Sequence, residues 1–204
     1  MEDIFEKIRS KSRREMARQN FERNSACDAN AATSTEDRIV NDQNGATGGA
    51  FVLGKYSASY NACETIAVHN AKVLLGMPSS LSETISRFHV FRAVLLKGFF
   101  GGNVYKIGRI LRFYGVRSKR FFSRRRLAKE GLYIISFWNE KPLKNGLHTV
   151  ALTFDGKEYT TYNLHGNGRA AHEDPREYGK RFIVGYYLGK TERGGTPAAS
   201  GDEK

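Results

Sequence analysis

The sequence predicts an α+β fold in which helices come first and an antiparallel sheet follows. Stretches with the hydrophobic period of helices are 62–75, 81–91 and 104–114. Short runs rich in β-branched and aromatic residues, typical of strands, are 133–138, 149–154, 158–163 and 182–188. Because helices grouped before strands are typical of α+β domains, we expect an antiparallel sheet packed on the first of these helices.

Local signals place the ends of the predicted helices. The first helix is apolar on most sides and ends at Gly76. Ser80 and Glu83 resemble a capping box, which predicts that the second helix begins there and runs through Phe91. A glycine-rich turn at 98–102 then precedes the third helix.

We expect the folded domain to span 51–190. Ahead of it, 1–24 have the pattern of a charged helix, and 25–50 are small and polar with paired glycines, which predicts a partly disordered linker. The composition of 191–204 likewise predicts a flexible tail.

The 204-residue chain has two cysteines, and its charged N-terminus has no apolar signal core. No apolar run is long enough to span a bilayer, so we expect no transmembrane segment and a cytoplasmic location. Two cysteines are not a disulfide framework, and no His/Cys spacing suggests zinc. We therefore expect reduced thiols, no metal and no cofactor.

Cys63 begins the first predicted helix and is the first functional candidate. If Asn61 is the N-cap, the thiol lies at the second helical position. Unpaired backbone N–H groups and the helix dipole would lower the pKa of a thiol there, as a reactive cysteine requires. A cysteine on an apolar helix is more often a packing residue, so both interpretations stay open on this feature alone.

His148 and Asn163 are the second functional candidate. Asp155-Gly156 lies between two strand-like runs and predicts a two-residue type I′ turn. That register places His148 opposite Asn163, with Cβ atoms about 4.5–5.5 Å apart. The asparagine would then hold one imidazole nitrogen while the other faces the thiol. A three-residue loop would pair His148 with Leu164 instead. Taken separately, the two residues are ordinary for a strand start and a turn.

A cysteine at a helix start, a later histidine and a facing asparagine resemble the papain-like cysteine peptidases. The sequence is most similar to the double-glycine leader peptidase domains that trim bacteriocin precursors. The resemblance covers 56–187 and includes Asn-Ala-Cys-Glu-Thr-Ile-Ala-Val-His-Asn-Ala at the cysteine, the glycine-separated helices of 81–115, and 148–163. It implies that Cys63 is the nucleophile, His148 the base and Asn163 the orienting residue. His165 is the substitute base if His148 fails.

The resemblance implies cleavage of a peptide or amide substrate through an acyl-enzyme, with acyl transfer to an amine as an equally open outcome. It also implies an oxyanion-binding glutamine six residues before the cysteine, but Ser57 occupies that position. The backbone N–H of Cys63 can supply one donor, and Asn61 is our candidate for the second, with Gln43 more distant. Without a second donor the chain would be a catalytically weak papain-like binding module.

The net charge of +12 comes from one segment. Residues 84–129 hold thirteen Lys or Arg and no Asp or Glu, while the other 158 residues hold twenty basic and twenty-one acidic side chains. Aromatic residues interleave with the basic ones across 106–129, which makes nucleic-acid binding the main alternative function. The segment also fits docking of an acidic partner or an anionic membrane surface, or a solvated basic face. The candidate anion ligands are Arg117, Lys119, Arg120, Arg124, Arg125 and Arg126.

Overall fold

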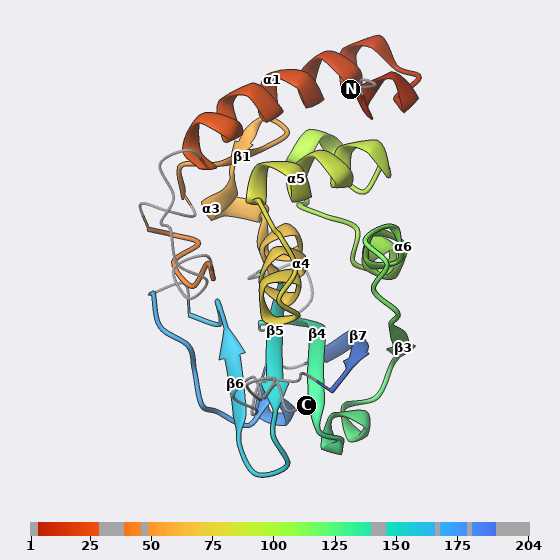
Figure 1. Ribbon diagram of the computed structural model, residues 1–204. Helices are drawn as coiled ribbons and strands as arrows, with labels where there is room; N and C mark the ends of the chain where they lie inside the picture. Colours follow the sequence, from red (N-terminus) through yellow and green to blue (C-terminus); the bar gives the residue numbers. More distant parts are fainter. Residues whose placement is uncertain are drawn as a thin grey trace, which may run out of the picture.

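A computed structural model of the chain describes residues 4–28, 39–45, 49–139, 146–165, 168–178 and 181–190. In these ranges helices precede a five-stranded antiparallel sheet, which confirms the predicted α+β class (Figure 1). The linker expected at 25–50 is described only in part. The tail expected at 191–204 lies outside the described residues.

The α-helices are α1 (Lys11–Asp28), α3 (Ala58–Asn61), α4 (Cys63–Leu74), α5 (Leu81–Val90) and α6 (Ile107–Phe113). Short 3₁₀ helices are η1 (Ile4–Lys7), η2 (Leu96–Gly98), η3 (Val104–Lys106), η4 (Arg124–Ala128) and η5 (Pro175–Glu177). The predicted cap of α5 is confirmed, because the Ser80 hydroxyl accepts a hydrogen bond from the Glu83 N–H at 3.0 Å. Within the described ranges, no helix combines the length and the apolar character that crossing a bilayer requires.

The main sheet has the strand order β3–β7–β4–β5–β6, with every neighbouring pair antiparallel. Its strands are β3 (Lys119–Phe121), β4 (Gly131–Trp138), β5 (Leu147–Phe154), β6 (Tyr159–Tyr162) and β7 (Arg181–Gly189), and a separate two-stranded ribbon joins β1 (Val52–Leu53) to β2 (Tyr56–Ser57). The sequence did not indicate β3, because two of its three residues are exposed cations that hide the strand pattern.

The hairpin between β5 and β6 differs from the two-residue turn that the sequence predicts. Phe154 pairs with Tyr159, so the loop contains four residues. The Asp155 carboxylate accepts hydrogen bonds from the N–H groups of Lys157 and Glu158, both at 2.8 Å. This side-chain turn satisfies backbone donors that a type I′ turn would leave to cross-strand pairing. The predicted pairing of His148 with Asn163 is therefore wrong.

The two faces of the sheet carry separate cores. On one face α4 packs over β4 and β5, with Ala67 and Ala71 against Ile134 and Ala151. Alanines on the helix allow its backbone to approach the sheet closely. The opposite face holds a second, more aromatic cluster: Phe121, Leu127, Tyr133, Ile135, Phe137, Val150, Leu152, Tyr159 and Tyr178. Residues on β5 thus alternate between the α4 face and the aromatic face.

Helix α1 crosses the end of the molecule that lies away from the sheet, next to α5 (Figure 1). Its buried Asn24 side chain pairs with the backbone of Val52 through two hydrogen bonds of 2.9 Å. Asn20 makes the equivalent pair with Gly54, at 2.9 and 2.7 Å. These bonds cross the boundary that the sequence placed at residue 51. Cys27, expected in the linker, lies in the last turn of α1.

Candidate active site

Cys63 is the first residue of α4, and its side chain is 5% exposed. Asn61 ends the short helix α3, and Ala62 joins it to α4 without a side-chain cap. The expectation that Asn61 caps the helix is therefore wrong. The Cys63 Sγ lies 3.7 Å from the carbonyl oxygen of Leu147, which begins β5. Both cysteines of the chain are free thiols.

The pKa of the Cys63 thiol is raised well above its ordinary value, mainly by burial and next by the charge of Glu64. Hydrogen bonds with Thr149 act in the opposite direction but do not compensate. The sequence predicted a lowered pKa from the helix start. That expectation is wrong because loss of hydration disfavours the thiolate more than the helix dipole favours it. The Cys63 thiol is therefore protonated at neutral pH.

His148 lies one residue after Leu147 on β5, and its ring has a fixed orientation. Its Nε2 is 2.8 Å from the backbone carbonyl oxygen of Asn163. A carbonyl only accepts, so Nε2 carries the ring proton and Nδ1 keeps the free lone pair. Burial is the main cause that lowers the pKa of His148, partly offset by the carbonyls of Asn163 and Leu164. The imidazole is therefore neutral near pH 7 and able to accept a proton at Nδ1.

The strand alternation places Cys63 and His148 on different sides of β5. Thr149 faces α4 and its hydroxyl lies 3.0 Å from that of Ser136. His148 stacks edge-on with Phe137 of the aromatic face, with ring centroids 5.9 Å apart. Both Cys63 and His148 nevertheless line one cleft of about 1070 Å³, which reaches the end of the sheet where β5 begins. The structure brings the side chains of Cys63 and His148 to one cavity, where the thiol is hydrogen-bonded to the Leu147 carbonyl.

Asn163 holds the histidine with its backbone and not with its side chain. The residue follows β6 directly and has a φ of 62°, which turns its carbonyl toward the imidazole. Its amide Nδ2 donates to the Gln43 Oε1 at 2.9 Å, and its Oδ1 accepts from the Gln43 N–H at 3.2 Å. The Asn163 N–H also donates to the Asn41 side chain at 2.8 Å. The segment around Gln43 thus fixes the residue that orients His148.

The three oxyanion candidates have different environments. Ser57 is the N-cap of α3, and its hydroxyl donates to the Gly49 carbonyl at 2.9 Å, outside the cleft lining. Gln43 lines the cleft, but its amide donates to the carbonyls of Ala58 and Ser59 at 3.0 and 3.3 Å. Asn61 also lines the cleft and is 7% exposed. Among the described residues, neither polar atom of its side chain has a hydrogen-bond partner, which leaves Asn61 as the available donor.

Glu64 is a cleft residue that the sequence reasoning missed. It follows Cys63 directly, is buried, and accepts a hydrogen bond from the Gly102 N–H at 3.0 Å. Burial raises the pKa of its carboxyl to about 7. The available signal was an acidic residue directly after the candidate cysteine, in the first turn of the helix.

Aromatic rings line one end of the cleft. They are Tyr60 of α3, Phe99 and Phe100 of the turn after η2, and Tyr105 of η3. All four are exposed, although large apolar rings are usually covered in folded domains. His165, the substitute base, also lines the cleft, but its Nε2 pairs with the Glu173 carboxylate at 2.9 Å.

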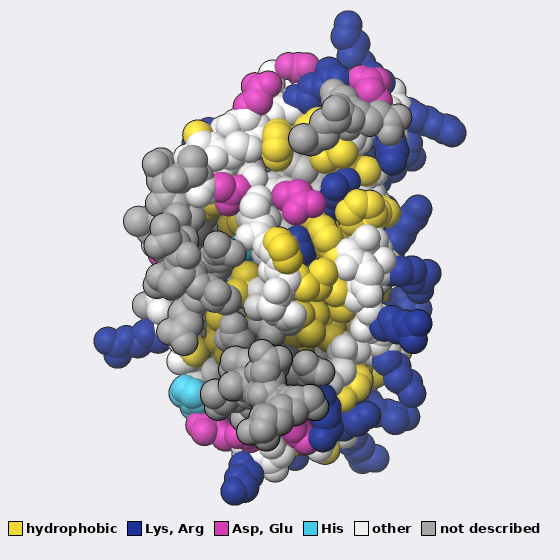
Figure 2. All heavy atoms as spheres, in the orientation of Figure 1, with side chains coloured by type: hydrophobic (Ala, Val, Ile, Leu, Met, Phe, Trp, Pro, Cys, Tyr) yellow, Lys and Arg dark blue, Asp and Glu magenta, His cyan; other side chains and the backbone are white. Residues whose placement is uncertain are grey.

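The predicted anion ligands lie away from the cleft lining. Arg117, Lys119, Arg120, Arg125 and Arg126 are exposed, whereas Arg124 is half-buried and donates to the Arg176 carbonyl at 2.6 Å. Lys and Arg side chains gather along the edge of the molecule where α6 and β3 lie (Figure 2). Of the aromatic residues that accompany them, Phe121 packs inward and Phe122 is exposed beside Arg120.

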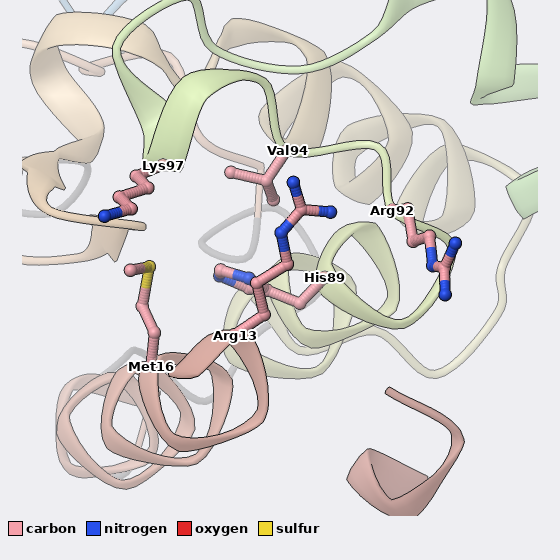
Figure 3. A pocket seen from close by; sticks show the side chains of 6 residues that line it. All are labelled: Arg13, Met16, His89, Arg92, Val94 and Lys97. Atoms are coloured by element: carbon pink, nitrogen blue, oxygen red, sulfur yellow. The ribbon is translucent and has the colours of Figure 1, made fainter. Parts of the chain in front are cut away.

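A second cavity of about 30 Å³ lies between α1, α5 and the turn that follows α5 (Figure 3). Its lining is Arg13, Met16, His89, Arg92, Val94 and Lys97. The buried His89 Nε2 lies 3.0 Å from the Asn20 Oδ1, so the ring helps to hold α1 against α5. In the described part of the chain, neither this cavity nor the cleft contains three His, Cys, Asp or Glu side chains placed to hold a metal.

The chain matches no protein-family model, no curated protein and no solved structure.

Proposed function

We propose that the chain is a papain-like cysteine peptidase or amide hydrolase, with Cys63 as nucleophile and His148 as base. The observation that supports this most is one cleft that contains a thiol at a helix start and a neutral imidazole with an oriented, unprotonated Nδ1. The order of these residues, and the packing of the cysteine's helix on an antiparallel sheet, also agree with a papain-like fold.

Catalysis begins when the thiol leaves the Leu147 carbonyl and turns toward His148. The imidazole Nδ1 takes the thiol proton, and the sulfur attacks the substrate carbonyl carbon to form a C–S bond. The carbonyl electron pair moves to oxygen. That oxyanion accepts hydrogen bonds from the Cys63 N–H, which has no partner within the helix, and from the Asn61 Nδ2. His148 then returns its proton to the leaving amine as the C–N bond breaks. Water, or an acceptor amine, then gives a proton to His148 and attacks the thioester carbon; the C–S bond breaks, and His148 returns the proton to the Cys63 sulfur.

Because the resting thiol is neutral, the test uses probes that bind in the cleft before they react. A panel of peptidyl vinyl sulfones with uncharged side chains should form an adduct at Cys63, mapped by mass spectrometry. Cys63→Ala should abolish that adduct. His148→Ala should slow its formation by about a hundredfold, as loss of a general base does.

The control is His165→Ala, which changes another histidine of the cleft. It should leave the labelling rate within about threefold of the wild type, a change of less than about 1 kcal/mol in activation free energy. An adduct found only at Cys27, or equal rates for His148→Ala and wild type, would reject the hydrolase proposal.

A second candidate function is supported by the exposed cations along α6 and β3. Arg120 lies against the exposed ring of Phe122, with its guanidinium carbon 5.4 Å from the ring centroid. An exposed aromatic among cations suits contact with nucleobases and phosphates. Binding of single-stranded DNA should then weaken steeply between 50 and 200 mM salt and fall further in the Phe122→Ala variant. DNA binding that does not change with salt concentration would exclude this role.

A further inference from the structure

The aromatic end of the cleft is built from rings that contact one another and still face solvent. Tyr60 is 62% exposed, Phe99 45% and Phe100 55%. The Tyr60 and Phe99 ring centroids lie 6.4 Å apart, and those of Phe99 and Phe100 lie 4.9 Å apart in an edge-on arrangement. Tyr56 stacks on the Tyr60 ring at 5.7 Å and lies edge-on to the Phe99 ring at 5.8 Å. The rings therefore form one continuous apolar surface.

This surface is fixed close to the nucleophile. Tyr60 precedes Cys63 by three residues. The turn that carries Phe99 and Phe100 is anchored to the start of α4, because the Gly102 N–H donates to Glu64 at 3.0 Å. At Gly101, which has a φ of 66°, an added Cβ would lie 2.6 Å from the Asn61 carbonyl oxygen. The turn and the helix start thus touch backbone to backbone.

Backbone hydrogen bonds also hold the turn itself. The Leu95 N–H donates to the Gly101 carbonyl at 2.9 Å and closes the turn. The Lys97 carbonyl accepts from the Lys55 N–H at 2.9 Å, which ties the turn to the β1–β2 ribbon. The exposure of Phe99 and Phe100 is therefore a property of a well-bonded turn and not of a frayed one.

The cleft lining has far fewer charged side chains than the rest of the molecule. The chain has a net charge of +12, but the described residues that line the cleft include no Lys or Arg. Glu64 is the one acidic residue among them, and it is buried against Gly102. The described lining residues therefore offer a charged substrate side chain no partner at the aromatic end.

From these observations we infer that Tyr60, Phe99 and Phe100 bind an aromatic or large aliphatic side chain of an uncharged peptide segment, next to the carbonyl that Cys63 attacks. The position of that side chain next to the attacked carbonyl rests on the proposed function. Covering the exposed rings removes apolar surface from water, and offset or edge-on ring contacts add to the gain. A glycine or a charged residue at that place in the substrate would leave the rings in solvent.

The test measures binding separately from chemistry. Trp138 is the only tryptophan of the chain and lines the cleft, so its fluorescence reports occupancy. The Cys63→Ala variant is titrated with acetyl-Gly-Phe-Gly-Gly-amide and with the same peptide carrying Gly, Lys or Glu in place of Phe. We expect the Phe peptide to bind about tenfold more tightly than the others, the discrimination typical of an apolar pocket.

In the same background, Phe99→Ala should remove that tenfold preference. Phe113→Ala and Phe122→Ala are matched controls, because those rings are 48% and 62% exposed and lie outside the cleft lining. Neither should change the titrations. Equal binding of all four peptides, no binding of any, or a preference that survives Phe99→Ala would overturn the inference.

Failure of the catalytic proposal has a different signature. If the Phe peptide is preferred while vinyl sulfones leave Cys63 unmodified, the aromatic binding site stands and the hydrolase role falls. If Cys63 reacts equally fast with Phe and Gly vinyl sulfones and the titrations show no preference, the hydrolase role stands and the aromatic site falls.

Discussion

The imidazole of His148 is held by the backbone carbonyl of Asn163, 2.8 Å from Nε2, while the Asn163 amide pairs with Gln43. An orienting residue that acts through its main chain depends on its backbone conformation. The φ of 62° at Asn163 is such a conformation, one that asparagine adopts more readily than most other residues.

Asn163 and Gln43 should therefore be coupled in stability. Asn163→Ala removes two hydrogen bonds to Gln43 and leaves buried polar groups unpaired, so we expect a loss of about 1–3 kcal/mol in the free energy of unfolding. Gln43→Ala should cost a similar amount. In a double-mutant cycle by urea unfolding, the double variant should lose clearly less than the sum. Additive losses would show that the two side chains do not depend on each other.

Glu64 should control how readily Cys63 ionises. Its charge raises the pKa of the thiol, so Glu64→Gln should lower that pKa and keep an acceptor for Gly102. At pH 8 the rate of Cys63 alkylation by iodoacetamide, followed by mass spectrometry, should rise about threefold to tenfold, since one pKa unit is a tenfold change in thiolate. Glu83→Gln, on α5 and outside the cleft lining, is the control and should leave the rate unchanged. An unchanged rate in Glu64→Gln would contradict the electrostatic argument.

His89 should make the fold sensitive to acid. Burial lowers its pKa to about 4, whereas an unfolded histidine titrates near 6.5. Between these values the unfolded chain binds the proton more readily, so this part of the stability is lost as pH falls from 6.5 to 4. Arg13, Arg92 and Lys97 line the same cavity and offer a protonated ring no compensating charge (Figure 3).

The measurement is urea unfolding at pH 7, 6, 5 and 4. His89→Gln keeps a donor for Asn20 but cannot titrate, so it should lose about 2–3 kcal/mol less stability than the wild type over this range. The comparison between the two proteins cancels the contribution of His148, whose pKa is also lowered. Parallel losses in both proteins would remove His89 as the cause.

Asn24 should matter far more than its place on a polar helix suggests. Asn24→Ala deprives the Val52 N–H and carbonyl of partners in a buried setting, and we expect a loss of about 2 kcal/mol. Gln19→Ala is the matched control, because Gln19 is exposed and its side chain donates along α1, to Glu15 at 2.9 Å. It should change stability by less than about 0.5 kcal/mol. Equal effects of the two substitutions in thermal unfolding would mean that α1 is not clamped by its asparagines.

Several elements could be predicted from the sequence because their signals are local. The Ser80 cap, the apolar pattern of α4 and the β-rich runs of β4, β5 and β7 each lie within one short segment, and each agrees with the structure. The hairpin failed for a local reason as well, since Asp155 uses its side chain to close a longer loop. Asparagine or aspartate before glycine favours a tight turn, but the same side chain can cap its neighbours instead.

Only part of the candidate site could be predicted from the sequence. Cys63, His148 and Asn163 were named from residue type and order, and all three line the cleft. Their roles shifted: the thiol is neutral and Asn163 acts through its carbonyl. The contacts that make Glu64 and Gln43 important depend on the residues packed around them, and residue spacing in the sequence does not reveal those contacts.

By itself, the sequence determined the segments of α4, α5, β4, β5 and β7 and which thiol begins the central helix, because periodicity and capping act over a few neighbouring residues. Only the tertiary structure decided the charge state of that thiol, since desolvation depends on everything packed around it. It also decided how the histidine is held, because Gln43 and Asn163 meet across 120 positions of the chain.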